Sequence, residues 1–156
     1  MEQIHLSEIA EVWLHVTGAE PSFDSPFNGA DYVCLVVALA NCPNDFRNGV
    51  ASRLVETACR HAICTGPEGS EWDDAVDWAF LETDENYEPP DERFVMTTWR
   101  ELEPVEDTVF VFLKASGFDN LVFRNYLVLF VHEDESLRHR LVKQVRSELA
   151  QPERAV

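Results

Sequence analysis

Residues 31–40, with the sequence DYVCLVVALA, contain the longest apolar run of the chain and decide its fold class. The run is rich in Val and Leu and lacks the polar alternation of a strand that is buried on one face only. It is also far too short to cross a bilayer as a helix, which takes about 20 apolar residues. We therefore predict a central strand of a sheet that is covered on both faces.

Apolar runs alternate with helical spacings along the chain after this strand. Further strands are predicted at 61–65, 94–99 (FVMTTW) and 125–132 (NYLVLFVH). Apolar residues three and four apart predict a helix after each strand, and the starts are Asp45, Ser70 in a capping box with Asp73, Pro104 and Ser136. The order βαβαβαβα predicts an α/β fold, a three-layer Rossmann-like sandwich with a four-stranded, mainly parallel sheet.

The first 30 residues form an N-terminal helical extension in this prediction. Ile9, Val12, Trp13 and Val16 have the spacing of one helix face, so a helix is expected over Ser7–Val16. Residues 19–30 contain Pro and Gly and are expected to be a loop. Residues 1–156 are thus expected to form a single α/β domain, with the extension at 1–30 and the core at 31–150.

The composition limits the possible compartments and partners. The 156 residues include 12 Lys and Arg against 29 Asp and Glu, which gives a net charge of −17. This charge disfavours binding to nucleic acid or to an anionic membrane. The N-terminus does not have the charge pattern of an export signal, so we expect a soluble cytoplasmic protein with four reduced cysteines.

Polar residues that follow the predicted strands supply one candidate site. The carboxyl ends of parallel strands meet at one rim, where α/β proteins bind ligands. A small Rossmann-like hydrolase or ligand-binding enzyme would use Asp45, Arg100, His132 and Glu133 there. The first loop of this rim, residues 40–45, contains neither GxGxxG nor GxxxxGK[ST], and the spacing of Cys59, His61 and Cys64 matches no standard zinc pair. No cofactor or metal is therefore expected.

The densest feature of the sequence is acidic. Residues 68–92 contain 11 Asp and Glu and no Lys or Arg. Asp73, Asp74 and Asp77 are expected to share the outer face of the second helix, opposite a buried stripe that begins at Trp72. The candidate partner-binding residues are Asp73, Asp74, Asp77, Glu82, Asp84, Glu85, Tyr87, Glu88, Asp91 and Glu92.

Four short segments carry a resemblance to a known group of sequences. They are CTGP at 64–67, WDDAVD at 72–77, VMTTW at 95–99 and YLVLF at 126–130. Together they resemble a family of short bacterial proteins that is known as an uncharacterised domain, over roughly residues 31–135. The resemblance implies a Rossmann-like fold and no assigned activity.

We interpret the chain as a non-enzymatic binding protein of immunity or antitoxin type, with no catalytic residues. Its acidic residues would neutralise a basic protein partner, such as a toxin or nuclease, because complementary fields speed association. The alternatives are the small enzyme described above, a DNA-mimic inhibitor, and a structural or oligomerisation subunit. The sequence leaves the oligomeric state open.

Overall fold

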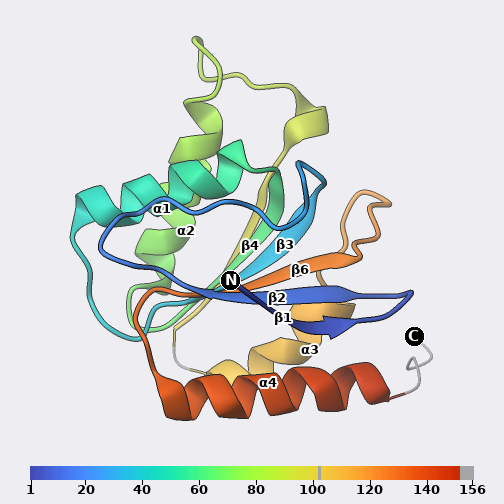
Figure 1. The fold of residues 1–156 in the computed structure, drawn as a ribbon. Coiled ribbons are helices and arrows are strands. Elements are labelled where there is room, and N and C mark those ends of the chain that lie inside the picture. The colour runs from blue at the N-terminus through green and yellow to red at the C-terminus, as the bar shows by residue number, and fades with distance from the viewer. Residues whose placement is uncertain (102, 152–156) are drawn as a thin grey trace.

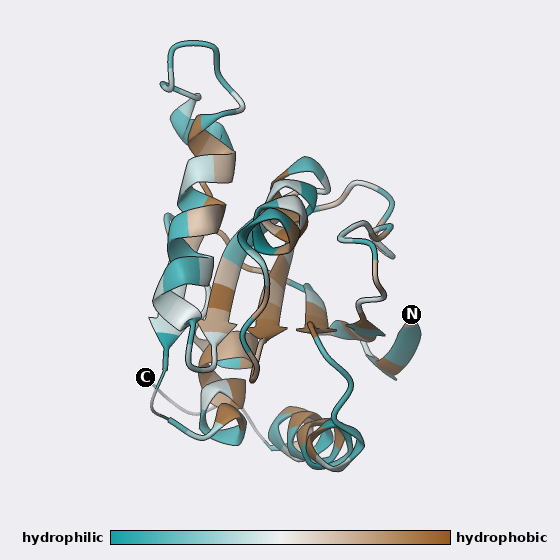
Figure 2. Ribbon diagram, turned by 90° about the vertical axis from the view of Figure 1, so that its left-hand side faces the viewer, coloured by the Kyte–Doolittle hydropathy of each residue, from teal (hydrophilic) through white to brown (hydrophobic). Residues whose placement is uncertain are grey.

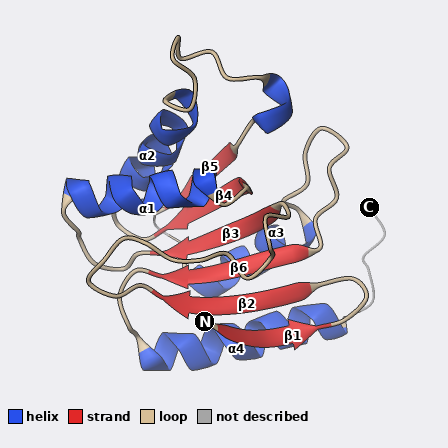
Figure 3. Cartoon of the chain, turned by 45° about the horizontal axis from the view of Figure 1, so that its top comes forward, coloured by secondary structure: helices blue, strands red, loops and turns tan. Residues whose placement is uncertain are grey.

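The chain folds around one mixed sheet. The computed structural model describes residues 1–101 and 103–151, and in these the sheet has six strands, in the order β1-β2-β6-β3-β4-β5 (Figure 3). The strands are β1 (Glu2–Leu6), β2 (Glu11–Val16), β3 (Tyr32–Val37), β4 (Cys59–Thr65), β5 (Met96–Arg100) and β6 (Asn125–Phe130). Strands β2 to β6 are parallel to one another, and β1 pairs antiparallel with β2.

Helices cover both faces of this sheet (Figure 1). On one face lie α1 (Asn44–Glu56) and α2 (Gly69–Leu81). On the other lie α3 (Val109–Lys114), which follows a short 3-10 turn, and α4 (Glu135–Ala150). The α/β class is confirmed. The four-stranded sheet is corrected to six strands, one of them antiparallel.

Strand β3 lies inside the sheet, as its apolar run predicts. Every residue of β3 is buried, and β3 pairs with β6 on one side and β4 on the other. Cys34 and Val36 belong to the core under α1 and α2, whereas Leu35 and Val37 belong to the core above α3 and α4. Successive residues therefore supply two separate cores, which is why the sequence has no polar alternation there.

The predicted helix over Ser7–Val16 is wrong, because the end of this segment forms strand β2. Val12 and Leu14 are buried in the core on the α3–α4 face, and Trp13 packs into the core on the opposite face. The apolar residues fit a helical spacing and an alternating one equally well, and such short segments are ambiguous. Pairing with β6 from Glu11 to Val16 decides in favour of the strand, since it extends the parallel sheet.

The segment between β2 and β3 covers part of the sheet. Phe23 and Phe27 are buried in the same core as Leu127 and Leu129 of β6. Arg53 of α1 donates a hydrogen bond from Nε to the carbonyl oxygen of Phe23 at 2.6 Å. The first 30 residues are therefore an integral part of the core and not an appendage to it.

Several predicted element ends differ from the structure. Helix α1 ends at Glu56, Ala58 follows with a φ of 75°, and β4 begins at Cys59 and not at residue 61. Ser70 and Asp73 form no capping box. The Ser70 amide at the start of α2 instead donates to Glu101 Oε1, which follows β5, at 3.0 Å. The cap of α4 is Asp134, whose Oδ1 accepts from the Leu137 amide, and not Ser136.

In residues 1–101 and 103–151, none of the helices is both long enough and apolar enough to cross a membrane.

Candidate functional site

Exposed acidic side chains gather on α2 and on the segment that joins it to β5. This segment rises beyond the sheet and is mostly hydrophilic (Figures 1 and 2). Of the ten predicted partner-binding residues, eight are exposed and form what we call the acidic surface: Asp74, Asp77, Glu82, Glu85, Tyr87, Glu88, Asp91 and Glu92. Within the described residues, none of its carboxylates forms an ion pair with Lys, Arg or His.

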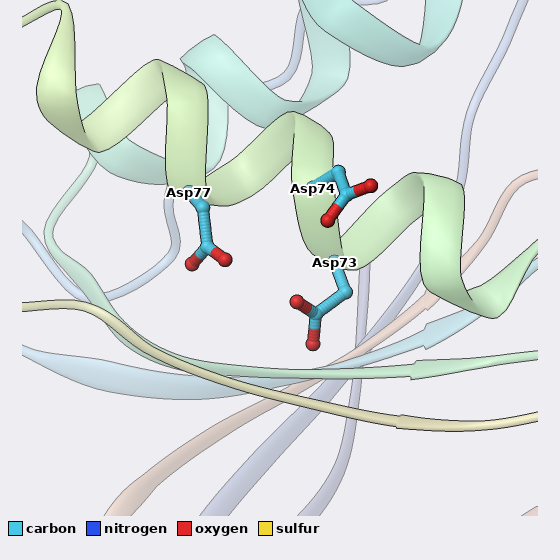
Figure 4. Close-up of side chains that lie close together, drawn as sticks. All are labelled: Asp73, Asp74 and Asp77. Carbon is cyan, nitrogen blue, oxygen red and sulfur yellow. The ribbon is translucent and has the colours of Figure 1, made fainter.

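Asp73 does not lie on the outer face of α2, which corrects the prediction for this residue. Its exposed fraction is only 9%. Asp73 and Asp77, one helical turn apart, point from α2 toward the strands beneath it (Figure 4). The Thr97 hydroxyl of β5 lies 3.1 Å from Asp73 Oδ1 and 3.0 Å from Asp77 Oδ1. Both carboxylates therefore belong to the contact between α2 and β5.

The Asp73–Asp77 pair is electrostatically strained. Burial, together with the charge of Asp77, raises the pKa of Asp73 to about 6, and burial also raises the pKa of Asp77. The Thr97 hydroxyl has one hydrogen, so it can donate to only one of the two carboxylates at a time. The other carboxylate remains next to a like charge. A proton or another cation at this position would relieve the repulsion.

Asp74 brings a third carboxylate to the same turn of α2. One oxygen from each of Asp73, Asp74 and Asp77 lies within 4.8 Å of the other two. Carboxylate oxygens at this spacing can coordinate a divalent cation, and they can equally accept hydrogen bonds from a Lys or Arg side chain. The chemistry that this turn of the helix offers is thus the binding of a positive charge.

Asp84 shapes the segment after α2 and is half-buried, unlike the exposed acids around it. Its Oδ2 accepts hydrogen bonds from the amides of Asn86 and Glu88 at 3.0 and 3.1 Å. This turn places Tyr87 at a φ of 57° with an exposed fraction of 57%. Tyr87, one of the predicted partner-binding residues, is therefore available to a partner, whereas the Asp84 carboxylate is used within the segment.

Exposed aromatic side chains beside the acids are the feature that sequence reasoning missed. Trp78 of α2 is 58% exposed, Trp99 of β5 is 51% exposed, and Phe94 just before β5 is 38% exposed. The sequence did contain a signal for Trp78, because it falls outside the apolar stripe that predicted α2. Exposed Trp and Tyr are frequent at the centres of protein interfaces.

The residues of the alternative enzyme site do not come together. Arg100 ends β5 and His132 follows β6, and with β3 and β4 between them these strand ends are about 14 Å apart at the usual strand spacing. Arg100 Nε pairs with Glu103 Oε2 at 2.7 Å, and Glu133 Oε1 lies 3.7 Å from an Arg138 nitrogen. Asp45 is exposed in the first turn of α1. The four side chains therefore do not form one catalytic site.

The rim beyond β3 and β4 is held together by an ion pair between buried Arg47 and half-buried Glu68. An Arg47 guanidinium nitrogen lies 2.8 Å from Glu68 Oε2, and the other terminal nitrogen donates to Asn44 Oδ1 at 2.7 Å. The Cys42 amide donates to Glu68 Oε1, and this bond, together with Arg47, lowers the pKa of Glu68. These polar groups join two loops and are not free for chemistry.

Gly66 lets the same two loops approach closely. It has a φ of 103°, and a Cβ added there would lie 1.9 Å from the Ala38 carbonyl oxygen. A larger residue at this position would push the loops apart. Gly66 thus has a packing role at the rim.

Cys59 and Cys64 lie in one core, whereas the ring of His61 lies elsewhere. Cys59 and Cys64 are buried in the core under α1 and α2. The ring of His61 bonds through Nδ1 to the Ser116 carbonyl oxygen at 2.8 Å and through Nε2 to the Thr98 hydroxyl at 2.9 Å. Both ring nitrogens are thereby occupied, and burial lowers the pKa of His61.

Comparison with known proteins identifies one related group. Residues 11–148 match the family described as "Domain of unknown function (DUF7684)". Neither the curated proteins nor the solved structures contain a match to the chain. The matched region includes α2, the acidic surface and five of the six strands of the sheet in the described residues.

Proposed function

This chain belongs to the DUF7684 family, which is described without an activity, and from its own surface we propose that it is a non-enzymatic binding protein for a basic protein partner. The observation that carries the proposal is the acidic surface. Its seven carboxylates have no cation partners within the described residues, although the chain has 12 Lys and Arg. Neighbouring carboxylates repel one another, and a cationic partner would remove this repulsion.

The Asp73–Asp77 pair supports the same partner chemistry. One of these carboxylates always lacks the Thr97 hydrogen, and a Lys or Arg from outside can donate to it. Trp78 and Trp99 flank this position in α2 and β5 and can pack against the same cationic side chains. An acidic surface with exposed aromatic anchors suits the recognition of Lys and Arg on another protein.

Proteins of immunity or antitoxin type are the class that we favour. Such proteins neutralise a basic toxin or nuclease by covering its cationic surface, and electrostatic complementarity brings the association rate toward about 10⁸–10⁹ M⁻¹s⁻¹ at low salt. A DNA mimic would target a DNA-binding groove with carboxylates spaced along an elongated body. Here the acidic surface lies on α2 and on the segment that follows it, at one end of the molecule, which favours a local docking surface (Figure 1).

The proposal is tested by affinity capture with two variants. Both carry the same change in net charge, at different positions on the surface. Tagged wild-type protein is incubated with lysate of its source organism with and without EDTA, washed at low and then high salt, and the retained proteins are identified by mass spectrometry. The first variant carries Asp74→Lys and Asp77→Lys in α2. The matched control carries Glu8→Lys and Glu20→Lys, two exposed acids outside the acidic surface, and has the same net charge.

We expect wild type and control to retain the same basic protein at low salt. The α2 variant should retain less of it, because its association rate is reduced by about tenfold or more. High salt should release it. Circular dichroism should show that all three proteins are folded. Equal retention by the α2 variant and the control would reject the acidic surface as the binding site, and retention that EDTA abolishes would point to a bridging metal instead.

A further inference from the structure

Strand β5 forms one end of the sheet, beside the acidic surface, and among the described residues no strand pairs with its outer edge. It runs in unbroken register with β4 from Met96 to Arg100 and contains neither Pro nor Lys. The opposite edge strand, β1, has a register shift between Gln3 and His5. Bulges, Pro and charged side chains, Lys above all, are the usual devices that protect an edge from a further strand. Strand β5 has no bulge, Pro or Lys, and its one charged residue, Arg100, is the last residue of the strand.

The two faces of β5 have different surroundings. Thr97 faces α2, where its hydroxyl meets Asp73 and Asp77, and Trp99 lies on the same face two residues later. Thr98 faces the other way, toward His61, and Met96 and Arg100 share that face. A strand added beside β5 would alternate in the same manner. Every second side chain would lie on the side of α2, next to carboxylates.

Distances favour cations at those alternate positions. An added strand lies about 4.8 Å beyond its neighbour. The Asp77 carboxylate is 3.0 Å from the Thr97 hydroxyl and is exposed, so it lies over β5 at the edge where the new strand would pair. A long Lys or Arg side chain from that strand would reach Asp77 first. Asp74 would come next, because its carboxylate lies within 4.8 Å of that of Asp77. The existing cations, Arg93 and Arg100, stand before β5 and at its last residue, away from Thr97.

We propose that a basic segment of the partner binds as an additional strand along the outer edge of β5, with Lys or Arg at alternate positions on the side of α2. This inference rests on the proposed function and specifies how the partner is recognised. Main-chain hydrogen bonds to β5 would supply affinity, and the carboxylates would select the sequence. A second copy of this chain is a poor occupant, because its β5 would bring another Asp73, Asp74 and Asp77 against the first set.

The test uses a blocked peptide of about eight residues in which Lys and Val alternate, a length that matches an ordinary strand. The control peptide has the same sequence with N-methylated backbone amides, so that it keeps its charge and loses its hydrogen-bond donors. Binding is measured by calorimetry at low salt, and amide hydrogen exchange of the full-length protein is followed with each peptide. The protein variants are Asp74→Asn with Asp77→Asn, and Glu8→Gln with Glu20→Gln as the control.

We expect the alternating peptide to slow amide exchange in residues 96–100 and the N-methylated peptide to bind at least about tenfold more weakly. The Asp74→Asn, Asp77→Asn variant should lose affinity for the alternating peptide by a similar factor, and the control variant should not.

Two results would overturn strand addition and leave the proposed function intact: equal affinity for both peptides, or peptide binding without protection of residues 96–100. Failure of the alternating peptide to bind at all would also reject strand addition. The proposed function itself fails only in the capture experiment, when charge reversal on α2 does not change retention of the partner.

Discussion

Burial next to the Asp77 carboxylate sets the response of Asp73 to pH, and the single hydroxyl hydrogen of Thr97 serves only one of the two carboxylates at a time. An unfolded Asp titrates near pH 3.9, whereas Asp73 in the folded protein has a pKa of about 6. Between these two pH values the folded state binds more protons than the unfolded state. The free energy of unfolding therefore falls as the pH rises through this window, and the loss persists at neutral pH.

Replacing Asp73 with Asn should stabilise the protein at neutral pH. The amide removes the strained charge and can donate a hydrogen bond to Asp77. We expect the Asp73→Asn variant to gain about 1–3 kcal/mol at pH 7.5 and to lose less stability between about pH 4 and 6. Urea unfolding at a series of pH values measures both effects.

A matched control for this prediction is Glu88→Gln, which removes one charge from an exposed position in the segment after α2. Its stability should stay within about 0.5 kcal/mol of wild type at every pH. A less stable Asp73→Asn variant with an unchanged pH profile would show that ionised Asp73 is favourable in the fold.

At the scale of elements, the N-terminal residues extend the sheet and then cover it. Strand β2 pairs with β6, and the segment after β2 places Phe23 and Phe27 in the core over β6. The Phe27 ring also packs against Tyr32 of β3, with the ring centroids 5.2 Å apart. Together these contacts replace the helix that the sequence predicts for this region.

Truncation of the Phe27 side chain should therefore lower the free energy of unfolding. The Phe27→Ala change leaves a cavity in a closed core, and a loss of about 3–5 kcal/mol in the free energy of unfolding is expected. Equilibrium urea unfolding followed by tryptophan fluorescence measures it. Ile9→Ala, at a 58% exposed position in the turn before β2, is the control and should change stability little. Similar small effects for both variants would mean that the segment after β2 does not seal the core.

At the scale of the whole molecule, charge is distributed unevenly. Eleven of the 29 Asp and Glu lie in residues 68–92, whereas Arg138, Arg140, Lys143 and Arg146 lie on α4, on the opposite face of the sheet (Figure 1). A net charge of −17 makes the compact state repel itself. Repulsion within the acidic surface therefore lowers the free energy of unfolding of the protein.

Added salt should therefore stabilise the isolated protein. The Debye length falls from about 30 Å at 0.01 M to about 10 Å at 0.1 M salt, so repulsion within the acidic surface is screened. We expect the Tm to rise by a few degrees between low and moderate NaCl. The rise should be smaller for the Asp74→Asn, Asp77→Asn variant. A Tm that falls with NaCl would show that favourable ion pairs outweigh the repulsion.

The sequence by itself determined the α/β class, the central position of the strand within residues 31–40 and the acidic segment at 68–92. Each of these depends on local pattern, because an uninterrupted apolar run, a helical spacing and a run of like charge are visible in neighbouring residues. The tertiary structure decided the rest. Ser7–Val16 satisfies two periodicities, and only pairing with β6 makes its end a strand.

The direction of Asp73 depended on the position of β5, since only the edge strand supplies Thr97 beside it. The separation of Arg100 from His132 followed from the strand order, which local pattern does not contain. Exposure of Trp78 and Trp99 likewise depended on how much of α2 and β5 the neighbouring elements cover. The sequence therefore located the acidic residues, and the packing of distant segments decided which of their side chains are exposed to a partner.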